Sequence, residues 1–334
     1  ARDGTLYAYA TPSGSSYTLF KSTNGGESWS PTGQVTAAIV AIAVAPDDAN
    51  AVYYATNATV YKSSDGGVTF GVLPPGPGGA GSNNITITSM AIASLDGRVI
   101  AIGTRDRDSS QFGGVYTVNE SELANGWVNT AIGNYDVLAL AFSPNYAADR
   151  QLIAVATNET SALVTIRSGI TGWGTVSGNA TINGVVPGKA TIALPGDYNA
   201  TFFLAIDTGG NNGDVYRIER RLAPNSSNAT DLNIAAGDNL TGIDVTGLAV
   251  SGSNSAGYYL LAGAATSNRV YISADSGQNW ARSAKEPTGQ SKIHLSVAPN
   301  FSTSRRAYAV TSGAGSAFSY TSDGGITWNQ LSLI

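Results

Sequence analysis

The sequence contains no cysteine and a single histidine, His294. Without cysteine, the chain can form neither disulfide bonds nor a cysteine-based zinc site. One imidazole also argues against a multi-histidine metal centre and against a histidine-based catalytic triad. We therefore expect no metal and no cofactor, and we assign no catalytic residue. His294 alternates with apolar neighbours, so we expect a hydrogen-bonded core residue rather than a catalytic base.

Charge is also scarce, because Asp, Glu, Lys and Arg make up only 12% of the 334 residues and the formal net charge is −5. No basic patch is present, so nucleic acid is not an expected partner. No apolar run approaches the roughly 18 residues of a membrane span. The chain begins with Ala1 rather than Met, so we expect a processed chain or a portion of a longer one.

Short apolar runs, by contrast, recur along the whole chain. Five of them end at Thr11, Thr56, Thr104, Thr157 and Thr208, which are 45, 48, 53 and 51 residues apart. A repeat of this length, with many glycines and polar turns, is typical of β-propeller blades. Further apolar runs precede and follow each of these and predict an inner and a third strand.

The repeats divide the chain into seven units. The sequence therefore predicts an all-β fold, a single seven-bladed β-propeller of four-stranded antiparallel blades, and one domain spanning residues 1–334. The expected blades are approximately 1–34, 35–82, 83–134, 135–186, 187–241, 242–289 and 290–334. In the fifth unit, residues Arg221 to Thr230 read as a polar insert.

Four units carry a turn of the form Ser/Thr-x-Asp-x-Gly-x-Thr/Ser-Trp/Phe. The Asp or Asn side chain can accept backbone N–H bonds, the glycine allows a positive φ, and the aromatic ring can pack onto the apolar layer. The Asp or Asn and the aromatic residue of the four copies are Asn24 and Trp29, Asp65 and Phe70, Asp275 and Trp280, and Asp323 and Trp328.

This turn resembles the Asp-box, or BNR repeat, of sialidase-like and photosystem-assembly-factor-like β-propellers. The resemblance implies a propeller with each box between the third and fourth strands of a blade. Propellers with this box include sialidases, xyloglucan hydrolases, sorting receptors and photosystem assembly factors, so the resemblance implies no particular reaction. We expect the box residues to have a structural role.

Ten asparagines lie in Asn-x-Ser/Thr sequons, which is about twice the number that composition alone would produce. We expect all ten to lie in connections between strands, where an attached glycan could point to solvent. The pattern favours an extracellular, cell-surface glycoprotein. The predicted acceptors are Asn57, Asn84, Asn119, Asn158, Asn179, Asn199, Asn225, Asn228, Asn239 and Asn300.

A second group of candidate residues is acidic. The segment Arg105-Asp106-Arg107-Asp108 could present carboxylates, and Asp136, Asp207 and Asp244 could join them. A glycosidase needs two carboxylates, although acidic loop residues are expected in any acidic domain. The Phe/Tyr-Arg-Ile-Pro segment of sialidases is absent.

The first unit begins at its presumed second strand, so no inner strand for it is visible in the sequence. A strand outside this sequence, closure by side-chain packing, or strand addition from a neighbouring subunit could complete it. We predict a non-enzymatic structural subunit of a self-associating surface assembly such as an S-layer, sheath or filament, whose subunits this strand addition could link. The alternative is a carbohydrate-active enzyme or sugar-binding propeller, and the third possibility is an assembly or scaffold factor.

Overall fold

The computed structural model describes residues 4–10, 18–35, 37–74, 76–82, 84–176, 178–199, 201–221, 226–234, 238, 242–313 and 315–333. The chain divides into two compact units. The first contains Ala1–Glu159 and Leu163–Val176, and the second contains Thr160–Ala162 and Ser177–Ile334. The division falls within the fourth sheet, and each unit is described by itself below.

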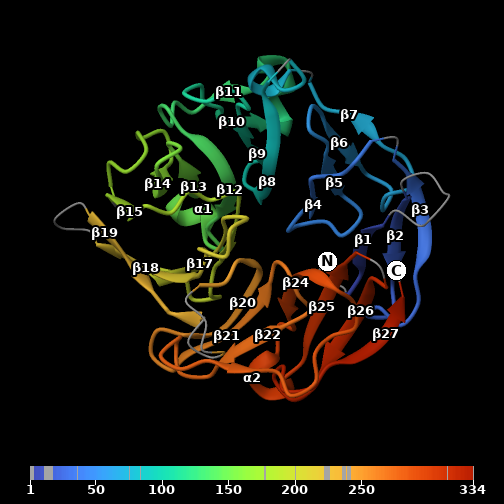
Figure 1. The fold of residues 1–334 in the computed structure, drawn as a ribbon. Helices are drawn as coiled ribbons and strands as arrows, with labels where there is room; N and C mark the ends of the chain where they lie inside the picture. Colours follow the sequence, from blue (N-terminus) through green and yellow to red (C-terminus); the bar gives the residue numbers. More distant parts are fainter. Residues whose placement is uncertain are drawn as a thin grey trace. The chain divides into compact units, whose positions relative to one another are not determined.

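The fold is an all-β, seven-bladed β-propeller, as the sequence predicts (Figure 1). Six sheets contain four antiparallel strands in sequence order, and the first contains three among the described residues. Those three correspond to the second, third and fourth strands of the other blades, because the Asn24 turn joins the last two of them. Every strand lies within one of the seven sequence repeats.

The first unit contains the first three sheets and most of the fourth. Its strands are β1 (Leu6–Ala10), β2 (Thr18–Ser22) and β3 (Ser30–Gln34); β4 (Ala41–Val44), β5 (Val52–Ala55), β6 (Val60–Ser63) and β7 (Gly71–Val72); β8 (Thr86–Ser94), β9 (Arg98–Arg105), β10 (Gly114–Asn119) and β11 (Val128–Asn129); and β12 (Asp136–Phe142), β13 (Gln151–Thr157) and most of β14 (Ser161–Ser168). Its short helical turns are η1 (Pro77–Gly79), η2 (Glu120–Asn125) and α1 (Tyr146–Asp149).

The second unit contains β15, the outer strand of the fourth sheet, and the last three sheets. Its strands are β15 (Asn179–Asn183); β16 (Lys189–Ala193), β17 (Thr201–Asp207), β18 (Val215–Arg221) and β19 (Ser226–Asp231); β20 (Val245–Ser253), β21 (Gly257–Ala264), β22 (Val270–Ser273) and β23 (Ala281–Arg282); and β24 (Ser291–Val297), β25 (Ala307–Ser312), β26 (Ala317–Thr321) and β27 (Asn329–Leu333). One helical turn, α2 (Phe301–Ser304), joins β24 to β25.

Burial follows strand position within a blade. The second strands β5 and β13 are buried at every residue, whereas the fourth strands β7, β11 and β23 are two residues long and exposed. A strand covered on both faces favours a continuous apolar run, and a strand at the surface does not. This difference explains why the second strands gave the clearest sequence period.

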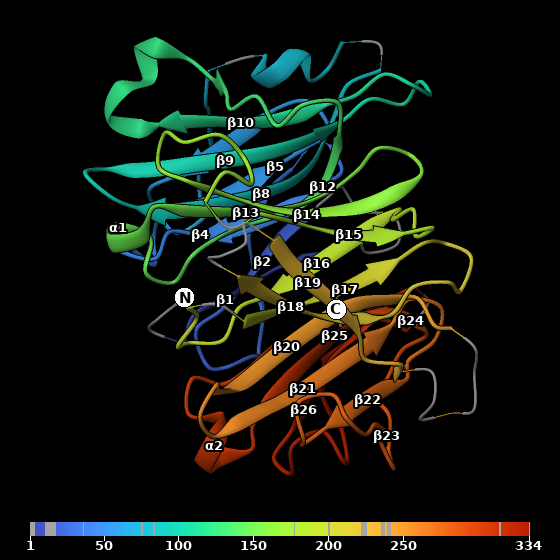
Figure 2. The ribbon, with the colours of Figure 1, turned by 90° about the vertical axis from the view of Figure 1, so that its left-hand side faces the viewer.

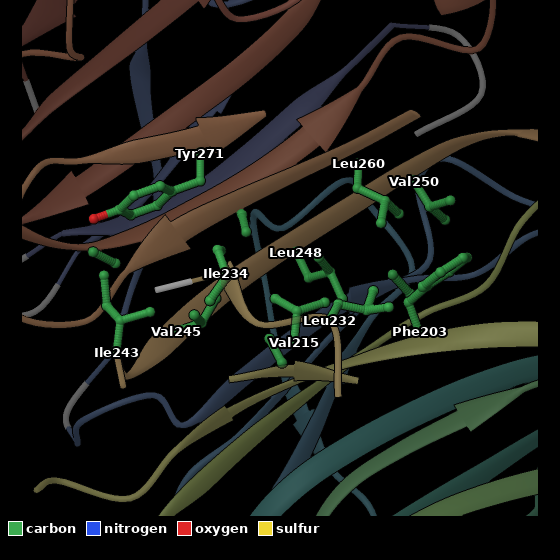
Figure 3. Close-up of a cluster of buried hydrophobic side chains, with 14 of the residues drawn as sticks. Phe203, Val215, Leu232, Ile234, Ile243, Val245, Leu248, Val250, Leu260 and Tyr271 are labelled. Atoms are coloured by element: carbon green, nitrogen blue, oxygen red, sulfur yellow. The ribbon is translucent and has the colours of Figure 1, made fainter. Parts of the chain in front are cut away.

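The largest buried cluster of the second unit lies between the fifth and sixth blades (Figure 3). Phe203 and Val215 from blade five face Val245, Leu260 and Tyr271 from blade six. Figure 2 shows β20, β21 and β22 side by side, and their pairing registers are antiparallel. Burial of apolar surface stabilises by roughly 25 cal/mol for each Å², so this packing helps to hold the two blades together.

Two sequence-based expectations fail in the second unit. Within the polar segment Arg221–Thr230, Arg221 ends β18 and Ser226 begins β19, so both ends belong to strands rather than to an insert, and residues 222–225 lie outside the described residues. Asn228 and Thr230 are exposed, which suits an outer strand with one face in solvent. His294 is exposed on β24 rather than part of the core, because it alternates with the buried Ile293.

None of the described helices is long and apolar enough to cross a membrane.

Candidate functional site

The four Asp/Asn turns share one hydrogen-bond pattern. In blade two, the buried Ser63 hydroxyl donates to Asp65 Oδ1 (2.7 Å) and accepts the Gly67 N–H (2.8 Å). The Asp65 carboxylate then accepts the Thr69 N–H (2.9 Å) and the Thr69 hydroxyl (2.5 Å). The turns at Asn24, Asp275 and Asp323 have the same bond from a backbone N–H to the Asp or Asn side chain. Their second side-chain bond differs, because Asn24 Nδ2 donates to Ser28 Oγ whereas the Asn279 amide and the Thr327 hydroxyl donate to their carboxylates.

These bonds favour the ionised carboxylates. Hydrogen bonds from Ser63 and Thr69 hold the pKa of Asp65 well below its usual range, and those from Asn279 lower the pKa of Asp275. Burial opposes ionisation of Asp323, but its bonds to Thr321 and Thr327 outweigh burial and lower its pKa. Because the acceptor lone pairs point into their own turns, the carboxylates stabilise the hairpins.

Four tryptophans join each blade to the preceding one. Each indole N–H donates to a residue that comes just after the fourth strand of the preceding blade. The pairs are Trp127 with the Pro74 carbonyl (2.8 Å), Trp173 with Thr130 Oγ1 (3.1 Å), Trp280 with the Leu232 carbonyl (3.0 Å) and Trp328 with Ser283 Oγ (3.2 Å). The recurrent aromatic residue therefore fixes neighbouring blades as well as its own turn.

The acidic residues considered as catalytic candidates also bind backbone. Asp244 accepts four hydrogen bonds, from the backbone N–H and hydroxyl of Thr208 and the N–H groups of Asn211 and Gly213. Burial opposes its ionisation, but these bonds outweigh burial and lower its pKa. Asp207 accepts the Gly209 N–H at 2.9 Å. The second-unit carboxylates thus hold the loop between β17 and β18.

Asp136 has the equivalent place in the first unit. Its Oδ1 accepts the N–H groups of Asp106 (2.9 Å) and Gly113 (3.0 Å), and its carboxylate is almost fully buried. Its Oδ2 makes no hydrogen bond and lies 3.6 Å from Arg105 Nε. Burial raises its pKa. Asp106 Oδ1 accepts the Asp108 N–H, and Asp108 accepts a bond from Asn84.

The predicted glycosylation sites differ in their surroundings. Asn57, Asn158, Asn179, Asn199, Asn228 and Asn300 are exposed. Asn84 is half-buried and its amide binds Asp108, and Asn119 is half-buried and accepts the Ser121 N–H. Asn225 and Asn239 lie outside the described residues. The expectation that all ten lie in connections was wrong, because the β-strands include Asn119, Asn179 and Asn228.

A polar pocket of about 380 Å³ lies in the second unit between blades five and six. Its blade-five wall consists of Arg217 on β18, Thr230 and Asp231 on β19, and the next two residues, Leu232 and Asn233. Asn233 has a positive φ of 49°, and its N–H bonds to Asp231 Oδ1 at 2.8 Å. This turn directs the chain back across the end of the blade.

The blade-six wall is the Asp275 turn itself, from Ser276 to Trp280. Gly277 has a φ of 87°, and a Cβ atom there would lie 2.5 Å from a methyl group of Leu232. Only glycine therefore allows the turn to approach blade five this closely. The Trp280 indole lines the pocket and binds the Leu232 carbonyl, so it fixes both walls.

The pocket is rich in hydrogen-bonding groups. Arg217 Nε forms an ion pair with Glu219 Oε1 (3.1 Å), and the Asn279 amide donates to Asp275 Oδ2 (2.7 Å). Gln278 and Asn233 are exposed at the wall. Sequence reasoning missed this pocket, and the polar stretch it singled out in repeat five shares only Thr230 with the lining. The described residues include no group of three His, Cys, Asp or Glu placed to hold a metal.

Comparison with known proteins shows likeness in fold. No family model matches the chain, and no curated protein does. Among solved structures, an ancestral GH74 enzyme is 16% identical with a TM-score of 0.61 over 94% of this chain and 43% of its own. A puromycin hydrolase is 11% identical with a TM-score of 0.62, over 99% and 52%.

A Mycobacterium tuberculosis puromycin-hydrolyzing peptidase is also 11% identical, with a TM-score of 0.60 over 100% of this chain and 51% of its own. The chain thus spans about half the length of these proteins. These three propellers belong to enzymes. The prediction of a non-enzymatic structural subunit of a surface assembly, linked by strand addition, was wrong.

Proposed function

We propose that this chain is a sugar-binding β-propeller and that the pocket between blades five and six is its sugar site. The observation that carries the proposal is a cavity of about 380 Å³ lined by an indole and several hydrogen-bonding side chains. Ligand pockets are typically in the range of about 300–1,000 Å³. The size suits a short saccharide rather than a protein segment.

The lining suits the chemistry of a pyranose. The Trp280 ring offers an apolar surface against which sugar C–H groups can pack, and the amides of Gln278 and Asn233 offer both donors and acceptors for hydroxyl groups. Asp231 adds a carboxylate acceptor. Because both walls are fixed by Trp280 and Gly277, the pocket is largely formed before the ligand arrives, which reduces the entropy cost of binding.

Isothermal titration against short oligosaccharides chosen from a glycan array tests this function. We expect binding to weaken by about tenfold or more when Gln278 and Asn233 are both changed to Ala, since each loses a hydrogen bond. The matched control is Val68→Ala, at the position equivalent to Gln278 in the blade-two turn, which is 61% exposed. Equal affinities for the double variant and the control would contradict the proposed site.

A second candidate function is glycoside hydrolysis, and Asp136 favours it. Its raised pKa suits a general acid, and its Oδ2 has no hydrogen-bond partner; carboxylates with separated pKa values are what a glycosidase uses. Asp136→Asn should then abolish release of reducing sugar, whereas Asp244→Asn, which alters the equivalent carboxylate, should not. Loss of activity in both variants, or no activity in the native protein, would contradict it.

The finer features fit an extracellular glycoprotein with Asp-box repeats. The shared bonds of the four turns support the Asp-box assignment, and six exposed sequon asparagines support glycosylation. Mass spectrometry of the native protein tests the second point: Asn57 and Asn179 should carry glycans, while Asn84, whose amide is engaged by Asp108, should not. Unmodified asparagine at all exposed sequons would argue against this localisation.

A further inference from the structure

The charges around the pocket do not balance. Among the described residues that line it, Arg217 alone is cationic, and it already forms an ion pair with Glu219, two residues further along β18. Asp231 also lines the pocket, and none of the described residues forms an ion pair with it. Its Oδ1 accepts only a neutral N–H, from Asn233. Because Arg217 is paired with Glu219, the Asp231 charge has no ion-pair partner among the described residues.

A second carboxylate lies just behind this wall. Asp214 is buried immediately before β18, where its Oδ1 accepts the N–H groups of Val215 (2.6 Å) and Ile234 (2.9 Å). Ile234 directly follows the pocket residue Asn233. Burial raises the Asp214 pKa to about 7, and the negative charge of Asp231 contributes to this rise. The two carboxylates are therefore electrostatically coupled. The Tyr216 phenol, the other titratable group beside both acids, stays neutral because burial raises its pKa.

We propose that the pocket selects a sugar that carries a protonated amine over the same sugar with its amine acetylated, and that Asp231 is the residue that recognises the ammonium group. This inference rests on the proposed sugar-binding function. An ammonium group would supply the missing positive charge and donate charge-assisted hydrogen bonds to the free Asp231 oxygen. A sugar carboxylate would instead face the Asp231 carboxylate, so acidic sugars should bind less well than the amine form.

Binding of a cation in the pocket should also release a proton from the protein, and titration can measure this release. A positive charge at Asp231 cancels the field that favours the protonated form of Asp214. Binding therefore lowers the Asp214 pKa and releases a proton near neutral pH, and by reciprocity the cation binds more tightly when Asp214 is ionised. An acetylated sugar brings no charge and should release almost no proton. Proton release is thus absent if the sugar binds through its hydroxyl groups alone.

The test compares a glucosamine trisaccharide with the N-acetylglucosamine trisaccharide by isothermal titration in buffers of different ionisation enthalpy. We expect the amine form to bind about twofold to fivefold more tightly, within the range for a solvent-exposed ion pair, with proton release for that sugar alone. Asp231→Asn should remove both the preference and the proton release while leaving the acetylated sugar bound. Asp96→Asn, which removes one charge from an exposed turn of blade three, should change neither.

Each outcome decides between the two proposals. If the acetylated sugar binds as tightly as the amine form, or if Asp231→Asn keeps the preference, the inference about charge is overturned and the sugar site stands. If neither sugar binds the native protein but other saccharides do, the preference is likewise overturned. If no saccharide binds, both the proposed sugar-binding function and the inference about the amine are wrong.

Discussion

Replacing Asp214 by Asn should stabilise the protein at alkaline pH and leave it nearly unchanged in acid. Burial is the main reason that the Asp214 pKa rises from 3.8 to about 7. The hydrogen bond from the Ile234 N–H lowers the pKa, and the Asp231 charge raises it further. The folded protein therefore holds this proton more tightly than the unfolded chain. The stability from the raised pKa is fully present below about pH 4 and is lost as the pH rises through about 7.

The difference between the two pKa values sets the size of the effect. It is about three, and each pKa unit corresponds to about 1.4 kcal/mol, so ionising the buried carboxylate costs up to about 4 kcal/mol. An asparagine has no such cost, and its Oδ1 can still accept the bonds from Val215 and Ile234. The gain in unfolding free energy should thus approach about 4 kcal/mol at about pH 8 and vanish near pH 4.

Urea unfolding followed by tryptophan fluorescence at about pH 5 and about pH 8 measures this difference. Asp244→Asn is the matched control with the opposite sign, because hydrogen bonds lower the Asp244 pKa. That variant should lose stability at about pH 8, with the loss fading as the pH falls through the Asp244 pKa. A pH-independent effect of Asp214→Asn, or destabilisation at about pH 8, would refute the reasoning.

Three further variants test the architecture. Trp328→Ala removes a fully buried indole and its bond to Ser283, and should lower the unfolding free energy in urea by about 3–5 kcal/mol; a loss below about 1 kcal/mol would contradict its role between blades. Ser63→Ala leaves the buried Gly67 N–H without its acceptor and should cost about 1–3 kcal/mol in the same assay. Asp136→Ala frees the amides of two loop residues, so hydrogen exchange of residues 106–113 should accelerate; unchanged protection would show that other contacts hold the loop.

The sequence predicted the blades because local chemistry determines them. The second strands are covered on both faces and so retain apolar runs such as Val52–Ala55 and Gln151–Thr157. The turns recur because a buried hydroxyl, a carboxylate and a glycine close each hairpin without help from elsewhere, as Ser63 and Asp65 do. The apolar run and the turn pattern each lie within about ten consecutive residues, so both can be recognised in the sequence without knowledge of the fold.

The features that the sequence did not predict depend on residues far apart in the chain. Trp280 reads as a turn aromatic, but its bond to Leu232 crosses 48 positions. His294 follows an alternating pattern, and the pattern alone does not say which face is buried. Asp136 and Asp244 look alike as loop acids, yet one has an unpaired oxygen and the other accepts four bonds.

The pocket arises where a variable turn position meets an unusual fourth strand. In the four turns the shared bonds leave one side chain unconstrained, and that position holds Glu27, Val68, Gln278 and Ile326. Only blade six has an amide at this position, and the fourth strand of the blade before it is the six-residue, polar β19, whereas blade seven follows the two-residue β23. The repeated residues of the turn stabilise the fold, whereas the variable residue is available for contact with a ligand. A search for the repeat therefore identifies the blades but not the pocket.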